Sequence, residues 1–510
     1  MEPLLLKDEP MVFEGFMKIC MNIVDADGIL VNTWQELEPT TLKALLSGEA
    51  IRGKIYPVGL LVRGINSNRT EKDHDLVLSW LDRQPAESVI FVSFGSGGTM
   101  SEALMEVKPL MARSAMAYVL ELSQQRFIWV VRPPHKEKTS ANHGSYFKLE
   151  YGENNTDSLL EKFLSRTHEL GLMVPMWAPQ LEILEHSSVG AFMSHCGWNS
   201  MFEAITNGVP MIAWQLYAEQ KMNAAALTEE MGVAVRVKRG GNKAEVVKRE
   251  EIQRLTRRVM VEEQGVYMRE RVKKLQRGAK MTLSEAGSSF DSIYQLANYC
   301  KTSSSTFIFS NTINMVLTVG NPSVALLCSP GIGHLIPMLE LGKCLMSNDG
   351  FDVTIFIVTT DSSTTHSQIV HQTSSNPKTA AALNVIVLPP VDVSSKLKPL
   401  NSSQFGARIR LTMEEALPLL RSAFLSMKLR PIALIVDLFG TDAFAMARDL
   451  EMLTYVFFTS SAWVLALAVH VPVMEKELLD RHVKLHEPLP IPGCKPLRFE
   501  DTMEPLLLKD

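Results

Sequence analysis

The sequence lacks several features that would place it in a specialised class of protein. It has only six cysteines in 510 residues, and they form neither a CxxC pair nor a group with histidines at zinc-ligand spacing. This argues against a disulfide framework and against a zinc site, and it favours a reduced cytoplasmic protein. Positive charge is not in excess either, because 51 Lys and Arg stand against 56 Asp and Glu. We therefore expect no nucleic-acid partner, which would need a basic surface to neutralise phosphates.

Long hydrophobic runs without charge are also scarce. The N-terminal stretch is acidic, and its apolar run is too short for a signal peptide. Leu453–Val473 contains no Asp, Glu, Lys or Arg and has the length of a membrane span. Serines, threonines, a histidine and a proline interrupt it, so we interpret it as a buried strand that runs into a core helix. We expect no membrane contact.

Short apolar strands followed by amphipathic helices recur along the chain. We predict strands at Ser88–Phe94, Val189–Met193, Val324–Cys328, Asp352–Val358 and Ile432–Val436. Strands that alternate with helices predict parallel sheets of the doubly wound type, with helices on their faces. Ligands bind such sheets at the carboxyl ends of the strands, and Gly, Ser, His and Asp residues follow several strands of this chain. A chain of this length is expected to form two or more domains.

One octapeptide, MEPLLLKD, stands at both ends of the sequence, at Met1–Asp8 and at Met503–Asp510. It is too short, and its copies are too far apart, for a structural repeat. The Ser, Thr and Asn content of Lys301–Pro322 predicts a linker in the middle of the chain. Met315, shortly before a predicted strand, has the position of an ordinary protein start.

Five segments resemble plant family 1 UDP-sugar glycosyltransferases, in particular the branch that acts on hydroquinone and simple phenylpropanoids. Trp177–Gln220 matches the signature box of that family over its full length, with WAPQ, HCGWNS, NGVP and the terminal AEQ in place. SPGIGHLIP at Ser329–Pro337 resembles the loop that carries the catalytic histidine of the family. The other segments are VNTWQELEP at Val31–Pro39, VSFGSGGT at Val92–Thr99 and VDLFGTDA at Val436–Ala443.

These segments stand in a different order from that of the family. The family has the SPGIGH loop near its N-terminus and the signature box in its C-terminal half, whereas here the box comes first. Starting at residue 315 and joining the ends through one octapeptide restores the family order, which implies a circular permutation. The implied fold is α/β GT-B, two Rossmann-like doubly wound domains that face each other across a cleft. Residues 315–510 and then 1–62 would form the acceptor-binding domain, and residues 63–314 the UDP-sugar domain with the linker and a helix that crosses back.

The resemblance implies a binding site for UDP-glucose as co-substrate. Its residues would be Trp177, Ala178 and Gln180 for uracil and ribose, Glu203 for the ribose hydroxyls, Ser96, His195, Asn199 and Ser200 for the diphosphate, and Trp198, Glu219 and Gln220 for the sugar. The diphosphate residues lie at turns from strand to helix, where free N–H groups and the helix dipole attract anions. We therefore expect neither a metal ion nor a cofactor. In the family, Gln220 and Trp198 go with glucose, and Ser460 or Ser461 is a further candidate for contact with the sugar.

His334 is the predicted general base and Asp437 its predicted partner. His334 follows a strand and a GxG turn, and Asp437 ends another strand. Neutral imidazole can take the proton of a phenol whose pKa is about 10, and the carboxylate would orient and stabilise the imidazolium. Direct attack would invert the anomeric carbon and form a β-glucoside on a small phenol such as hydroquinone, a phenylpropanoid or a flavonoid. We expect a monomer.

The sequence also departs from the family pattern. Met201 replaces a usual Ser or Thr, Gln215 replaces a usual Pro, and Thr99–Phe127 is about two helical turns longer than its counterpart. A nicotinamide-dependent oxidoreductase is a rival reading, but GIGHLI lacks the third glycine of GxGxxG, and no acidic residue follows at the expected distance. The alternative from another class is a catalytically impaired protein that binds a UDP-sugar or a small phenol.

Overall fold

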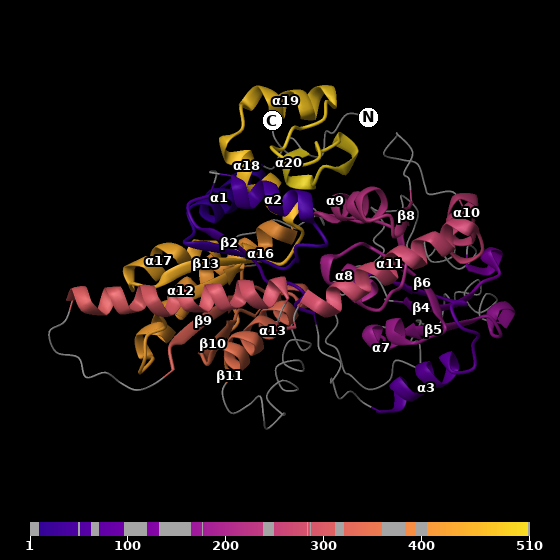
Figure 1. Ribbon diagram of the computed structural model, residues 1–510, viewed down its shortest axis with the longest axis horizontal. Coiled ribbons are helices and arrows are strands. Elements are labelled where there is room, and N and C mark those ends of the chain that lie inside the picture. Colours follow the sequence, from indigo (N-terminus) through magenta and orange to yellow (C-terminus); the bar gives the residue numbers. More distant parts are fainter. Residues whose placement is uncertain are drawn as a thin grey trace. The chain divides into compact units, whose positions relative to one another are not determined.

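The computed structural model describes residues 10–48, 51–62, 71–95, 120–131, 165–175, 177–237, 249–282, 284–285, 287–311, 321–359, 383–393 and 405–507. The chain divides into two compact units (Figure 1). Unit 1 consists of Met1–Ser67, Tyr217–Met222 and Gly278–Asp510, and unit 2 consists of Asn68–Leu216 and Asn223–Arg277. No helix in the described ranges is long and apolar enough to cross a membrane.

Unit 1 is built on a seven-stranded sheet in which every pair of neighbouring strands is parallel. In spatial order its strands are β11 (Leu383–Val387), β10 (Asp352–Ile357), β9 (Ser323–Cys328), β12 (Ala433–Asp437), β13 (Leu453–Phe458), β1 (Gly28–Val31) and β2 (Lys54–Pro57). Continuous apolar runs form the central strands, because parallel strands are covered on both faces. All six residues of β9, for example, are buried.

Strands from the first and last parts of the chain lie side by side in this sheet. β13 pairs with β1 in register, with Tyr455 beside Gly28 and Phe458 beside Val31. Counted from β9 to β13 and then on to β1 and β2, the strand order begins 3-2-1-4-5-6, a common order of doubly wound sheets. The order reverses between β9 and β12, and ligands bind such sheets at this switch point.

Unit 2 is built on a six-stranded sheet that is also entirely parallel. Its strands, in spatial order, are β5 (Gly171–Pro175), β4 (Arg126–Val131), β3 (Val89–Ser93), β6 (Val189–Ser194), β7 (Met211–Ala213) and β8 (Ala234–Arg236). Counted from β3, this sheet has the order 3-2-1-4-5-6 as well, and its switch point lies between β3 and β6.

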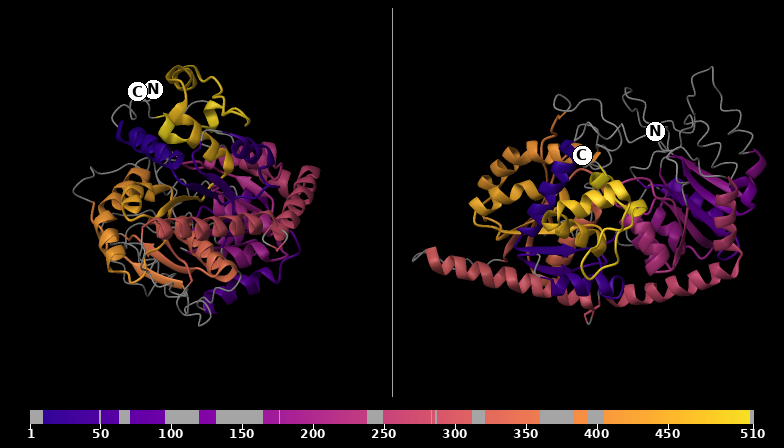
Figure 2. Two further views of the ribbon diagram at one scale, coloured as in Figure 1. Left: turned by 60° about the vertical axis from the view of Figure 1, so that its left-hand side comes forward. Right: turned by 90° about the horizontal axis from the view of Figure 1, so that it is seen from above.

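Helices connect the strands and bury their apolar faces against the sheets. These helices include α1 (Pro10–Val24), α7 (Gln180–Glu185), α8 (Trp198–Thr206), α11 (Glu263–Thr282), α12 (Ser288–Asn311), α13 (Ile332–Asp349), α18 (Ala462–His470), α19 (Lys476–Leu485) and α20 (Glu504–Leu507). α13 lies against β9 and β10. α12, coral in Figures 1 and 2, packs on α13 and β2 in the core of unit 1.

The predicted fold class is confirmed in its elements, since both units are doubly wound parallel sheets. The cleft between the domains, the permuted order and the domain boundaries stay predictions. The segment Leu453–Val473 forms β13 and then α18, as the reading of a strand followed by a core helix predicts.

The linker predicted at Lys301–Pro322 is wrong over its first part, because α12 continues to Asn311. Ser and Thr cost a helix only about 0.5 kcal/mol each relative to Ala. The helix is already held at its start by Ile293, Leu296 and Cys300, which lie in the core of unit 1. Tertiary packing therefore outweighs the weak local preference.

Candidate active site

In unit 1, the turn after β9 places His334 at the carboxyl end of the sheet. Gly331 precedes α13 with a φ of 131°, a conformation open to glycine but not to residues with a Cβ. His334 then falls in the first turn of α13, and its backbone N–H donates to the carbonyl of Gly331 at 3.2 Å. The side chain of His334 is 22% exposed. The backbone of His334 is thus held by a hydrogen bond, and its imidazole is partly accessible to a ligand.

Asp437 lies at the end of β12, the strand across the switch point from β9. Its carboxyl is fully buried, and its Oδ2 lies 3.5 Å from Nδ1 of His334. This separation exceeds the usual length of an N–H···O hydrogen bond, and the buried Nδ1 has no hydrogen-bond partner among the described residues. The structure therefore brings the predicted base and its predicted partner close together, without a hydrogen bond between them.

Two further residues, which the sequence analysis missed, complete the surroundings of this pair. Ser329 donates to Oδ2 of Asp437 from its backbone N–H at 2.8 Å and from its hydroxyl at 2.5 Å. The backbone N–H of Phe439 donates to Oδ1 at 3.1 Å, and the phenyl ring meets the imidazole edge to face at 5.5 Å. Ser329 could have been found from its position, because it is the first residue after a strand whose neighbour ends in a carboxylate.

In unit 2, three predicted donor-site residues meet where α7 approaches α8. Gln180 is the first residue of α7, and its Nε2 donates to Oε2 of Glu203 at 2.6 Å and to Oγ of Ser200 at 3.1 Å. Ser200 and Glu203 are three residues apart on α8 and therefore share one face of the helix. Trp177 is 36% exposed, whereas the adjacent Ala178 is buried. The large indole is thus available to a flat ligand.

His195 follows β6 directly and lies between two glycines at the switch point of unit 2. A Cβ on Gly95 would lie 2.4 Å from Cε1 of His195, and a Cβ on Gly197 would lie 2.5 Å from Nε2. Both distances are shorter than ordinary Cβ contacts, so a side chain at either position would displace the imidazole. Gly95 has a φ of 75° in addition. Nδ1 of His195 lies 3.2 Å from Oγ of Ser194.

The start of α8 carries both buried and site residues. Trp198 is 3% exposed and packs on Phe202 with a distance of 4.8 Å between the ring centroids. Met201 is fully buried, so the hydroxyl that it replaces would lie in the core of the unit and not at the surface of the site. Asn199 lies in the first turn of the helix, beside Ser200.

The remaining predicted residues are distributed as follows. Glu219 and Gln220 lie in Tyr217–Met222, the segment grouped with unit 1, and Oε1 of Gln220 accepts from the backbone N–H of Tyr217 at 3.1 Å. Ser96 lies outside the described residues, as does most of the long run after it. Ser461 caps α18 by accepting from the N–H of Val464 at 3.2 Å, whereas the buried hydroxyl of Ser460 has no hydrogen-bond partner in the part of the chain that the structure describes. In the described ranges, no three His, Cys, Asp or Glu side chains form a group that could hold a metal ion.

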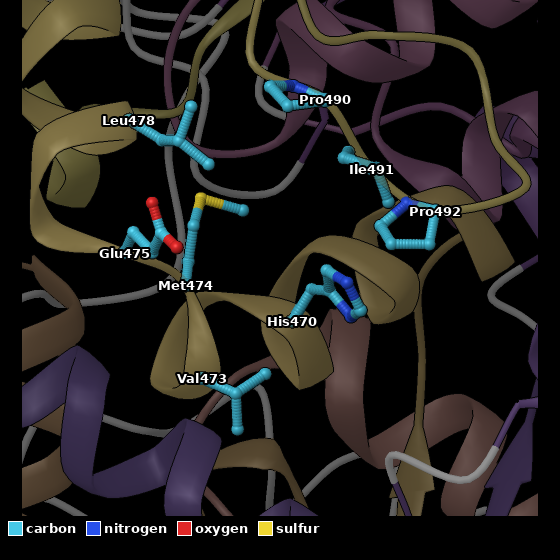
Figure 3. Close-up of a pocket in the computed structure, with 8 residues that line it drawn as sticks. All are labelled: His470, Val473, Met474, Glu475, Leu478, Pro490, Ile491 and Pro492. Carbon is cyan, nitrogen blue, oxygen red and sulfur yellow. The ribbon is translucent and has the colours of Figure 1, made fainter.

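Unit 1 also contains a pocket of about 350 Å³ at the C-terminal end of α18 (Figure 3). Its walls are His470, Val473, Met474, Glu475, Leu478, Pro490, Ile491 and Pro492. Burial lowers the pKa of His470 below its usual value. None of the predicted site residues lines this pocket, so it adds nothing to the candidate active site.

Two Rossmann-type sheets with polar residues gathered at their switch points define a two-domain α/β protein of nucleotide-binding architecture. Comparisons narrow this class. Residues 55–247 match the family described as UDP-glucoronosyl and UDP-glucosyl transferase. This match and the curated relatives below show that the chain is similar to plant UDP-glycosyltransferases.

Three curated plant proteins illustrate the similarity. UDP-glycosyltransferase 72E3 of Arabidopsis thaliana is 44% identical over 59% of this chain and 61% of its own length. Anthocyanidin 3-O-glucosyltransferase 5 of Manihot esculenta is 47% identical over 56% and 57%. Hydroquinone glucosyltransferase of Rauvolfia serpentina is 44% identical over 54% and 55%. The chain thus spans between half and two thirds of the length of these relatives.

Proposed function

We propose that this protein is an inverting glucosyltransferase that moves glucose from UDP-glucose to a hydroxyl of a small phenolic acceptor. The observation that carries this proposal is the placement of His334 beside Asp437 at the switch point of the sheet in unit 1. A reactive imidazole with a buried carboxylate partner suits the activation of a weakly acidic hydroxyl.

The geometry assigns different roles to the two ring nitrogens of His334. Because Nδ1 faces Asp437, Nε2 is the nitrogen left to accept the proton of the phenol. The phenol oxygen then attacks the anomeric carbon of glucose and UDP leaves, so that an α-linked donor becomes a β-glucoside. The carboxylate of Asp437 stabilises the imidazolium formed in this step, as the aspartate of a catalytic triad does.

In unit 2, the proposed donor site consists of an indole, a carboxylate and a helix N-terminus. The exposed indole of Trp177 offers a stacking surface for uracil, and the carboxylate of Glu203 suits two ribose hydroxyls. The N-terminus of α8, with Asn199 and Ser200, presents backbone N–H groups to the diphosphate. We propose no metal ion and no cofactor beyond UDP-glucose. Two relatives are named as glucosyltransferases of hydroquinone and of an anthocyanidin, which supports a phenolic acceptor.

Release of UDP from UDP-glucose in the presence of a panel of simple phenols tests this function. The variant His334→Ala should lose a factor of about 10²–10⁴ in kcat, the usual contribution of a general base. His168→Ala, which removes an exposed histidine of unit 2, is the matched control and should keep full activity. Binding of UDP without turnover by the wild-type protein would instead support the catalytically impaired alternative.

We further infer that the chain is circularly permuted, and that it is a cytoplasmic monomer with only UDP-sugar and acceptor as partners. The parallel pairing of β13 with β1 and the contact between α1 and α20 support the permutation. A gene reordered as residues 315–510 followed by 9–314 should give a protein with the same activity and melting temperature. An unfolded or inactive product would contradict this inference. Gel filtration and cell fractionation test the other two statements.

A further inference from the structure

We propose that Ser329 is a positioning residue of the reaction, which holds the carboxylate of Asp437 in place for His334. This inference rests on the proposed function. Ser329 is 1% exposed, so substrates do not reach it, and any effect on the reaction must pass through its neighbours.

The hydrogen bonds of Asp437 show how Ser329 would act. Oδ2, the oxygen nearest to His334, accepts both the backbone N–H and the hydroxyl of Ser329. Oδ1 accepts the N–H of Phe439 on the other side. Both oxygens of the carboxylate therefore accept hydrogen bonds, and Ser329 and Phe439, not the histidine, fix its orientation.

The donors around Asp437 stabilise the negative charge of a carboxylate that is fully buried. An ionised carboxylate without water is costly unless donors surround it, and hydrogen bonds to charged groups are stronger than those between neutral groups. The imidazole lies 3.5 Å away without a hydrogen bond and therefore contributes little to holding the carboxylate. Ser329 keeps the negative charge at the place where the imidazolium will form, which reduces reorganisation during proton transfer.

The chain contains a matched pair that lacks a catalytic neighbour. Thr454 donates to Oδ2 of Asp27 from its backbone N–H at 2.9 Å and from its hydroxyl at 2.8 Å. Thr454 is fully buried near the start of β13, three residues before Phe457, which is the register partner of Asp437. At about 3.3 Å per residue, it lies roughly 10 Å along the sheet from the catalytic end.

The experiment compares Ser329→Ala with Thr454→Ala in the full chain, with kcat and KM measured for UDP-glucose and one phenol. Loss of a hydrogen bond to a charged group predicts a decrease in kcat of about tenfold or more for Ser329→Ala. KM for both substrates should stay within about twofold, because binding groups are untouched. Thr454→Ala should keep the kcat of the wild-type protein. Equal decreases in both variants, or a decrease that lies in KM, would overturn the positioning role.

A double-mutant cycle with Asp437→Asn separates positioning from a general structural defect. If Ser329 acts through Asp437, adding Ser329→Ala to Asp437→Asn should change kcat by less than about twofold. A further tenfold loss in that background would overturn the proposal, since independent structural damage adds. Failure of the proposed function is recognised separately, because the wild-type protein would then show no turnover in the same assay.

Discussion

Glu38 offers a sharp test of how the first and last segments of the sequence are held together in unit 1. Its side chain is buried at 5% exposure and reaches the start of α18, more than 400 residues further along the chain. Oε2 accepts the N–H of Ala462 at 2.9 Å and the hydroxyl of Thr33 at 2.7 Å, and Oε1 accepts the N–H of Trp463 at 3.2 Å. The carboxylate thus satisfies two N–H groups that a helix N-terminus leaves open.

The change Glu38→Gln removes the charge and one of the two acceptor oxygens. Whichever way the amide is turned, its NH₂ group faces donors, and at least one buried donor loses its acceptor. An unsatisfied buried donor costs about 1–3 kcal/mol, and the lost interaction of the charge with the helix dipole adds about 0.3–1 kcal/mol. We therefore expect α18 to be destabilised by about 3 kcal/mol.

Hydrogen exchange of the α18 amides is the suitable assay, because it measures the opening of α18 itself and not the unfolding of the whole chain. A loss of about 3 kcal/mol corresponds to roughly a hundredfold faster exchange where global or local opening limits it. Glu36→Gln is the matched control: Glu36 is exposed, lies two residues away, and loses the same charge. Exchange of α18 at equal rates in the two variants would refute the reasoning.

Two further predictions concern pH and the donor site. Burial lowers the pKa of His482 below its usual value near 6.5, so the unfolded chain binds a proton before the folded protein does. The contribution of His482 to stability should therefore be complete above pH 6.5 and decrease as the pH falls below that value. In thermal melts, His482→Gln should make stability depend less on pH in this range. A variant whose melting temperature falls with pH as steeply as that of the wild-type protein would contradict the assignment. Gly197→Ala would push a Cβ to 2.5 Å from Nε2 of His195 and should weaken UDP binding at least tenfold by calorimetry, about 1.4 kcal/mol. Gly278→Ala, where a Cβ meets nothing within 4 Å, is the control and should bind UDP normally.

Much of the fold and of the candidate site could be predicted because it is encoded locally. Apolar runs such as the one that forms β9 predict buried parallel strands, and Gly, His and Asp residues lie at the ends of these strands. Parallel topology then brings those ends to one edge of a sheet. The pairing of His334 with Asp437 was predicted from the family resemblance together with their positions, since His334 follows a strand and Asp437 ends one.

Local pattern was therefore enough to predict most strands, their parallel arrangement and the residues at their carboxyl ends. The hydrogen bonds of Ser329 to Asp437, the two glycines beside His195 and the capping of α18 by Glu38 are visible only in the folded protein. It also overruled the predicted linker, because the packing of α12 prevails over the weak preference of its Ser and Thr residues. The physical reason is that local pattern reports which face a residue buries, whereas contacts between different elements depend on strand order and close packing.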